Sequence, residues 1–269
     1  MKSIKAIVLG GGLATILVMI MAFIDMRQRK TIEKLQNTEN SPGFAVVELF
    51  TSEGCSSCPP ADDLMEKIQL DNKNKQIYIL AFHVDYWDHQ GWKDRFSSPE
   101  YSGRQRQYNN WFNLRVQYTP QVVINGKTQY VGVDQGAILK AISGNLLQKS
   151  NSTLNLDTHI ERNELHVQHE TTSIEKNTEL VLALVQKYAH SDVKAGENTG
   201  KQLSHVQIVR KLANIPIDTN TNNTTTIELP DDFNKQKWEL IGFVQRESNG
   251  EVIAANRIDL PQNLASLDR

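Results

Sequence analysis

The chain has 269 residues with a formal net charge of −2; hydrophobic residues make up 39% of it and charged residues 22%. This globular composition excludes a chain that is disordered throughout and a membrane protein with many spans. The small net charge gives no indication of nucleic-acid binding. The two cysteines, Cys55 and Cys58, are too few for the disulfide framework of a stapled mini-protein or for a four-cysteine zinc site.

The first predicted element is a membrane-spanning helix. Residues from Ala6 to Ile24 are almost all apolar and would extend about 28 Å as a helix, close to the thickness of a bilayer core. No Ala-x-Ala cleavage pattern follows, so residues 1–30 are predicted to be an uncleaved anchor, in preference to a cleaved signal. Residues 31–42 are polar and predict a stalk. These features predict a body in the periplasm, anchored in the inner membrane of the cell envelope, or a secreted body if the segment is cleaved.

The next elements alternate between strand and helix. Phe44–Phe50 and Ile77–Tyr86 are short, nearly continuous apolar runs, typical of strands that are buried on both faces. Between them, Cys55-Ser-Ser-Cys58-Pro-Pro precedes apolar residues at helical spacing, which predicts a helix that starts at the cysteines. The strand–helix–strand order indicates a parallel pair with a right-handed crossover.

A helical insertion is predicted over residues 87–116, which hold three of the tryptophans. The dipeptide Asn125-Gly126 then predicts a hairpin turn between strands at Gln121–Ile124 and Thr128–Val133. Asp134 is a suitable cap for a helix that runs to Leu147. Residues 43–150 are therefore expected to form one α/β domain.

From about residue 152 the pattern changes to short segments that alternate apolar and polar residues. Polar turns separate seven such segments, which predicts an all-β antiparallel sandwich over residues 151–269. The predicted strands are Leu154–Ile160, Glu164–Glu170, Glu179–Gln186, Leu203–Leu212, Thr224–Leu229, Trp238–Arg246 and Val252–Ile258.

The Cys-Ser-Ser-Cys segment is the candidate site of chemistry. Unpaired amides and the positive end of a helix dipole favour a thiolate at the first cysteine. The second cysteine, one turn further on, can resolve a mixed disulfide. We therefore predict that Cys55 is an exposed nucleophile and Cys58 a more buried resolving thiol. Metal binding by the sulfurs and an inert disulfide are the alternatives.

Two further groups of residues are candidates. Glu48, on the first predicted strand, could carry protons to and from the resolving thiol, or could pair with a lysine. The residues after the second strand lie where ligands of open α/β sheets bind, and they could line a substrate groove or help to hold a soft metal such as Cu(I). Core packing and turn capping are the alternatives for them. They are His83, Asp85, Tyr86, Trp87 and Asp88.

The cysteine pair, with Thr119-Pro120 ahead of a strand–turn–strand, resembles the thioredoxin superfamily. That resemblance implies a thioredoxin-like fold for residues 43–150 and a cis peptide bond before Pro120. It also implies that Thr119 and Pro120 lie beside the sulfurs, where the backbone could pair with the extended chain of a client.

Longer blocks resemble an uncharacterised family of bacterial secreted, thioredoxin-like proteins, a domain of unknown function. The resemblance covers about residues 44–260 and implies fold and compartment, but no substrate. It also places His205 and Arg210 in a block of the sandwich, where we expect them at the contact between the domains. The blocks that carry it are residues 46–62, 82–88, 91–94, 118–126, 196–200 and 205–210.

The leading hypothesis is an extracytoplasmic thiol–disulfide oxidoreductase that acts through the dithiol and needs no cofactor or metal. Its expected partners are protein or small-thiol clients, a redox partner protein, and the membrane through the N-terminal helix, but not nucleic acid. One alternative is a Cu(I)-binding or metallochaperone module. The other is a non-catalytic binding protein with a structural disulfide.

Overall fold

A computed structural model of the protein describes residues 42–172, 175–217 and 223–260. The predicted anchor at residues 1–30 and nearly all of the predicted stalk lie outside these residues. Among the helices that the structure does describe, none is both long and apolar enough to cross a bilayer. The elements in chain order are β1 (Ala45–Thr51), α2 (Pro59–Asp71), β2 (Ile77–His83), the 3-10 helix η1 (Asp85–Gln90), α3 (Pro99–Trp111), β3 (Gln121–Ile124), β4 (Thr128–Val131), α4 (Gln135–Leu146), β5 (Leu154–Glu161), β6 (Glu164–Thr171), β7 (Thr178–Asp192), β8 (Gln202–Pro216), β9 (Thr224–Glu228), β10 (Trp238–Arg246) and β11 (Val252–Asp259).

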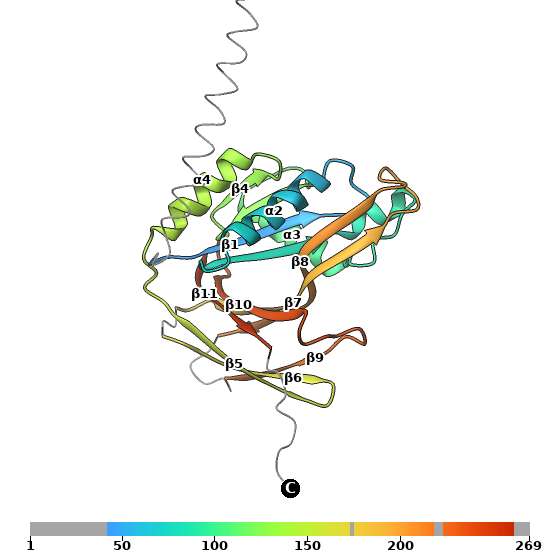
Figure 1. Cartoon of the computed structure of the whole chain (residues 1–269). Coiled ribbons are helices and arrows are strands. Elements are labelled where there is room, and N and C mark those ends of the chain that lie inside the picture. The colour runs from blue at the N-terminus through green and yellow to red at the C-terminus, as the bar shows by residue number, and fades with distance from the viewer. Residues whose placement is uncertain (1–41, 173–174, 218–222, 261–269) are drawn as a thin grey trace, which may run out of the picture.

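The dominant feature is one mixed sheet of eight strands in the order β11-β10-β7-β8-β2-β1-β3-β4. A second sheet has three strands in the order β5-β6-β9. Figure 1 shows α2 and α4 on one side of the large sheet, and the small sheet at the opposite end of the molecule. The local predictions are confirmed: every strand and helix expected between residues 44 and 258 is present, with ends shifted by a few residues.

The predicted fold class, an α/β thioredoxin-like domain followed by a separate sandwich, is wrong. The described chain is mostly β, and β7, β8, β10 and β11 extend the same sheet that contains β1 to β4. The junction is a parallel contact between β2 and β8, in which Ala81 faces Ile208. The physical reason lies in β7, where consecutive residues from Leu180 to Val185 are all buried. Such a strand needs cover on both faces, and a free-standing two-layer sandwich covers only one.

Three apolar cores join the helices, the large sheet and the small sheet. Alternate residues of β1, such as Val47 and Leu49, pack against α2 and α4. The intervening residues, such as Phe50, pack with Tyr108 of α3 and with strands from the C-terminal half. A third core fills the space between β7 and β10 and the small sheet, with Trp238 fully buried in it. The large sheet therefore buries both faces, and α3 contacts both halves of the chain.

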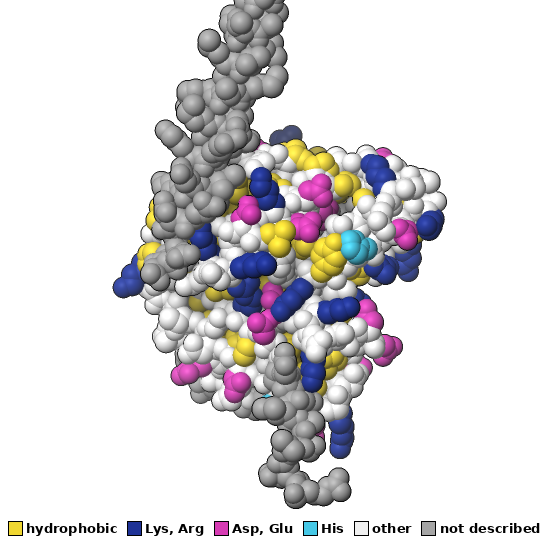
Figure 2. All heavy atoms as spheres, in the orientation of Figure 1, with side chains coloured by type: hydrophobic (Ala, Val, Ile, Leu, Met, Phe, Trp, Pro, Cys, Tyr) yellow, Lys and Arg dark blue, Asp and Glu magenta, His cyan; other side chains and the backbone are white. Residues whose placement is uncertain are grey.

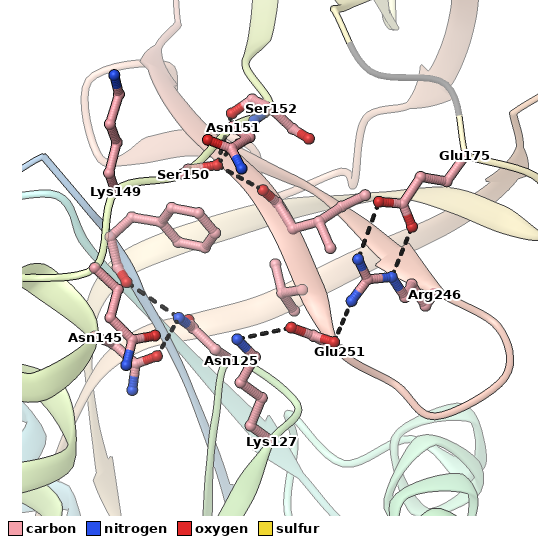
Figure 3. A pocket seen from close by; sticks show the side chains of 14 residues that line it. Asn125, Lys127, Asn145, Lys149, Ser150, Asn151, Ser152, Glu175, Arg246 and Glu251 are labelled. Carbon is pink, nitrogen blue, oxygen red and sulfur yellow. Dashed lines mark hydrogen bonds and ion pairs between the residues drawn. The ribbon is translucent and has the colours of Figure 1, made fainter.

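A polar seam also joins the two halves (Figure 3). The Asn125 carboxamide accepts a hydrogen bond from the Val46 amide (2.6 Å), while its backbone carbonyl accepts one from the Val252 amide (2.9 Å). Beside it, Lys127 pairs with Glu251 at 2.7 Å, and Glu251 in turn pairs with Arg246. These residues line the pocket that Figure 3 shows. Because their charges neutralise one another, we interpret the seam as structural. On the face shown in Figure 2, acidic and basic side chains are likewise interspersed.

Candidate functional site

The two cysteines form a disulfide where β1 leads into α2. β1 ends at Thr51, and Cys58 is the N-cap residue of α2, with prolines in the first helical turn. Prolines suit this position because the first amides of a helix have no intrahelical acceptor. The Cα atoms of Cys55 and Cys58 are 5.4 Å apart. The predicted helix start at the cysteine pair is confirmed.

Both cysteines are fully buried in the disulfide form, so the prediction that Cys55 is exposed is wrong. The loop between β7 and β8 holds the cysteine segment in place. The Asn198 side-chain amide donates to the carbonyls of Glu53 (2.9 Å) and Cys55 (3.0 Å). The Glu197 carboxylate accepts a hydrogen bond from the Ser56 amide at 3.0 Å. Only the two serines between the cysteines reach solvent freely.

The peptide bond between Thr119 and Pro120 is cis, as the resemblance implied. Gly132 lies between Pro120 and Ala61, which is in the first turn of α2. A Cβ atom at Gly132 would lie 2.7 Å from the Pro120 Cβ and 2.9 Å from the Ala61 Cβ, so glycine alone fits between them. The structure therefore brings Pro120 close to the helix that carries Cys58, and the position of Thr119 and Pro120 beside the sulfurs stays a prediction.

Trp87, one of the predicted groove residues, also reaches this region. Its indole N–H donates to the Thr119 hydroxyl at 2.8 Å. Its Cβ atom lies 3.2 Å from where a Cβ at Gly54 would be, directly before the first cysteine. Tyr86 beside it is half-buried, and burial raises the pKa of its phenol. Trp87 and Thr119 thus form a hydrogen-bonded pair next to the cysteine segment.

The acidic members of the predicted groove have structural partners. Asp85 accepts a hydrogen bond from the Ser102 hydroxyl of α3. Asp88 accepts from the Asp94 amide (3.2 Å) and from the Ser97 hydroxyl (2.7 Å). Asp85 therefore ties η1 to α3, and Asp88 ties η1 to the loop that follows it, which is the turn-capping alternative considered for them.

Glu48 lies on the face of β1 that packs against α3, whereas its neighbours Val47 and Leu49 face α2. It forms a buried ion pair with Arg104 and accepts a hydrogen bond from the Tyr108 hydroxyl. Burial opposes the charge of Arg104, but Glu48 outweighs this effect and raises the pKa of the guanidinium. Burial and the nearby carboxylate raise the pKa of Tyr108. Strand alternation thus directs Glu48 away from α2.

A buried cluster flanks the disulfide, and sequence reasoning did not assemble it. Its members come from the turn after β1, the first turn of α2, the end of β2, the loop after η1, and β8. All are at most 6% exposed. We call Glu53, Asp62, His83, Asp94 and His205 the histidine–carboxylate cluster.

The distances within this cluster are short. His83 Nδ1 lies 2.6 Å from Asp94 Oδ2. His205 Nδ1 lies 3.4 Å from Asp62 Oδ1, and its Nε2 lies 3.6 Å from Glu53 Oε1. The two imidazole rings meet edge to face, with their centroids 4.8 Å apart. Two rings thus stand between three carboxylates in a space closed to solvent.

Neighbouring residues fix the carboxylates. The Thr51 hydroxyl donates to Asp62 Oδ2 (2.9 Å), and the Trp92 indole donates to Glu53 Oε2 (2.7 Å). The Glu53 amide donates to Asp94 Oδ2 at 2.8 Å. Within the described part of the chain, His83 Nε2 is buried without a hydrogen-bond partner, whereas His205 Nε2 and Glu53 Oε1 face each other at 3.6 Å.

The charges of the cluster shift its proton affinities. Burial opposes the charged form of His205, but hydrogen bonds to Asp62 and Glu53 outweigh burial and raise its pKa to about 9. Burial would raise the pKa of Glu53, yet its contact with His205 leaves that pKa below the usual value. The same balance holds for Asp94, whose pKa is lowered because His83 outweighs burial. His205 and Glu53 therefore stabilise each other's charged forms, and His83 favours the charged form of Asp94.

Fold and site together define a mostly β protein with a large mixed sheet, in which a buried Cys-x-x-Cys disulfide adjoins a histidine–carboxylate cluster at the carboxyl ends of parallel strands. The chain belongs to the family described as "Protein of unknown function (DUF1223)", which it matches over residues 46–245. The predicted membership of an uncharacterised family is thus confirmed, whereas membership of the thioredoxin superfamily is not. A comparison with curated proteins gave no match.

Solved structures include one with a similar overall fold. A structural-genomics protein from Agrobacterium tumefaciens is 25% identical, with a TM-score of 0.60 over 84% of this chain and 97% of that one. A domain of the outer membrane lipoprotein Omp28 from Porphyromonas gingivalis is 10% identical, with a TM-score of 0.26 over 41% of this chain and 96% of that one. A β-glycosidase from Bacteroides vulgatus is 12% identical, with a TM-score of 0.20 over 40% of this chain and 13% of that one. The first supports the fold, and the other two are too distant to inform it.

Proposed function

We propose that the protein is an extracytoplasmic thiol–disulfide oxidoreductase that acts through Cys55 and Cys58. One observation carries this proposal: the disulfide stands at the start of a helix, and Pro120 lies near the first turn of that helix, with Gly132 between them. The positive end of the helix dipole stabilises a thiolate that is released there. The Ser57 hydroxyl, 3.4 Å from Cys55 Sγ, can donate a hydrogen bond to that sulfur once it is ionised.

The proposed exchange is balanced without a cofactor. A client thiolate attacks one sulfur of the disulfide, the Sγ–Sγ bond breaks, and the other cysteine leaves as a thiolate that takes up a proton. The second client thiolate then attacks the mixed disulfide, which releases an oxidised client and leaves both cysteines reduced. Two electrons pass from the client to the protein, and the reverse sequence reduces a client.

Burial sets a condition on this chemistry. Neither sulfur is exposed, so a client must first displace part of the cover. The β7–β8 loop is the segment to move, because Asn198 and Glu197 of this loop hydrogen-bond to the cysteine segment. A loop that opens at a cost of a few hydrogen bonds would gate access to the disulfide.

The compartment belongs to the same proposal. Disulfides persist in oxidising compartments such as the periplasm and are rare in the cytosol. The apolar segment from Ala6 to Ile24 would hold the body at the outer face of the inner membrane, or would direct its secretion if cleaved. The partners would then be thiol or disulfide clients of the cell envelope, or a redox partner protein.

The test is a trapping experiment in cells with the full chain carrying Cys58→Ser. Removal of the resolving thiol is expected to leave a mixed disulfide between Cys55 and its client, visible on non-reducing gels and lost on reduction. The matched variant Cys55→Ser is expected to trap less. The purified protein should show a reversible redox couple between about −120 and −300 mV, the range of known dithiol exchange proteins.

Other results would favour the alternatives. Absence of both a trapped species and a couple in this range would contradict the proposal and favour a structural disulfide. Stoichiometric Cu(I) bound by the reduced protein, and lost in Cys55→Ser, would favour a metallochaperone. A Cys55→Ser, Cys58→Ser variant with unchanged cellular phenotype would favour a non-catalytic binding protein.

A further prediction concerns the cover. Asn198→Ala removes both hydrogen bonds from the β7–β8 loop to the cysteine segment. We expect a small thiol to reduce the Cys55–Cys58 disulfide about 5-fold faster or more, because each lost bond is worth roughly 1 kcal/mol. Timed alkylation of the released thiols measures the rate. Asn110→Ala, at an exposed position of α3, is the matched control; equal rates for all three proteins would refute the gating role.

A further inference from the structure

The histidine–carboxylate cluster has the composition of a metal site. Ligand atoms of Asp62, His83 and His205 all lie within 4.8 Å of one another. Each side chain is at least nine-tenths buried. Imidazole nitrogen with carboxylate oxygen is a donor set that suits zinc and similar divalent ions.

One unpaired atom points to a ligand. His83 directs Nδ1 at Asp94, which leaves Nε2 buried without a hydrogen-bond partner. A buried polar atom without a partner costs roughly 1–3 kcal/mol, so His83 Nε2 favours a ligand within its reach. A carboxylate that orients one ring nitrogen while the other binds the metal is the usual support for a histidine ligand. Asp94 stands in that position relative to His83.

The partners of the carboxylates agree with a cation site. Glu53, Asp62 and Asp94 contact the two histidines, Thr51, Trp92 and backbone amides, rather than lysine or arginine. A divalent cation held by neutral imidazoles would serve as a counter-charge for these buried carboxylates.

We propose that Asp62, His83 and His205 bind a Zn²⁺ ion, with Asp94 as a positioning residue for His83. Asp62 would use Oδ1, because Oδ2 accepts the Thr51 hydroxyl, and His83 would use Nε2. Ligands about 2.1 Å from zinc lie roughly 3.4 Å apart, so the side chains must close on the ion by about 1 Å or less each. His205 would use Nδ1, which lies 3.4 Å from Asp62 Oδ1.

The ion has a route into the site. A surface hollow of about 350 Å³ is lined by Asp62 and His205, with Ser52, Pro59 and residues 201–204 around them. Two of the proposed ligands therefore border both the buried cluster and the hollow. The site is distinct from the two sulfurs, which are joined to each other in the disulfide. This inference does not depend on the proposed redox function.

The test is binding of Zn²⁺ to the oxidised full chain after treatment with a chelator, followed by calorimetry. We expect one equivalent of Zn²⁺, and a rise in Tm when it binds. Separate His83→Gln and His205→Gln variants are expected to weaken binding at least about 10-fold, and Asp94→Asn about 10-fold. His89→Gln, at an exposed position of η1, should leave binding unchanged.

Two measurements keep the test decisive if a histidine variant does not fold. Co²⁺ in the unmodified protein should give absorption bands of a four-coordinate site without a thiolate charge-transfer band. A Cys55→Ser, Cys58→Ser variant should retain the binding. A Kd for Zn²⁺ weaker than about 1 mM would overturn the proposal. A thiolate band, loss of binding in the cysteine-free variant, or unchanged binding in folded histidine variants would do the same.

Discussion

Replacement of Arg104 by methionine is expected to lower the free energy of unfolding by about 3–5 kcal/mol, because it leaves the Glu48 carboxylate buried without its counter-charge. Arg104 lies on α3 and is 4% exposed, and Glu48 on β1 is fully buried. The guanidinium also donates to the Tyr108 hydroxyl at 3.1 Å and to the Gln245 side chain at 3.2 Å. The lost residue therefore connects α3 to β1 and to β10.

Packing adds to the electrostatic loss. The guanidinium carbon lies 5.2 Å from the ring centroids of Tyr108 and Phe243 and 5.5 Å from that of Phe82. These rings come from both halves of the chain, so Arg104 stabilises the interface between them by cation–π contact as well as by charge. Loss of Arg104 should weaken the whole sheet rather than α3 alone.

Urea denaturation of the folded body measures the effect. Arg106→Met is the matched control, because Arg106 is exposed on the same helix and its loss should change stability by about 0.5 kcal/mol or less. The double variant Arg104→Met, Glu48→Leu is expected to recover part of the loss, since it removes the unpaired charge. Equal stability of Arg104→Met and Arg106→Met would contradict the proposed role of the pair.

The local elements could be predicted from the sequence because their determinants are local. Asp134 caps α4 through a hydrogen bond from the Ala137 amide, and Asn125-Gly126 forms the turn between β3 and β4. The C-terminal strands follow from short apolar or alternating segments and from the turn residues that separate them. These patterns involve neighbours in sequence, which one sequence displays directly.

The sheet order could not be predicted from the same patterns. The contact of β2 with β8 joins Ala81 to Ile208, residues far apart in the chain. One feature did carry information: the run Leu180–Val185 lacks polar residues, which is typical of a strand covered on both faces. Its assignment to a free-standing sandwich overlooked this feature. Topology otherwise depends on long-range packing that periodicity does not encode.

The candidate site also has parts that the sequence predicts and parts that it does not. The disulfide and its helix start were predictable because Cys55 and Cys58 lie close in sequence. Arg104 could not be predicted as the partner of Glu48, because an acid on an apolar strand does not reveal its partner. The cluster beside the disulfide collects Asp62, His83 and His205 from α2, β2 and β8. Each of these residues has an ordinary local explanation, and only the β2–β8 contact brings them together.

Replacement of Gly126 by alanine is expected to lower the free energy of unfolding by about 2–5 kcal/mol, from a steric clash and backbone strain. Gly126 has φ +63°, and a Cβ atom there would lie 1.7 Å from the Gly250 carbonyl oxygen and 2.6 Å from its carbon. Both are backbone atoms of the β10–β11 turn, so no side-chain rotation can relieve the contact. The β3–β4 turn and the β10–β11 turn must separate instead.

Separation of these turns would break the seam between the two halves. The hydrogen bond from the Val252 amide to the Asn125 carbonyl spans the same contact at 2.9 Å, and the Lys127–Glu251 ion pair lies beside it. Gly144→Ala is the matched control, because Gly144 lies inside α4 and a Cβ there would meet no atom within 4 Å. The control should gain about 0.5–1 kcal/mol from helix propensity. Urea denaturation measures the free energy of unfolding of both variants. A loss of stability in Gly126→Ala with a gain in Gly144→Ala would support the role of the close contact between the two turns. An unchanged stability of Gly126→Ala would refute it.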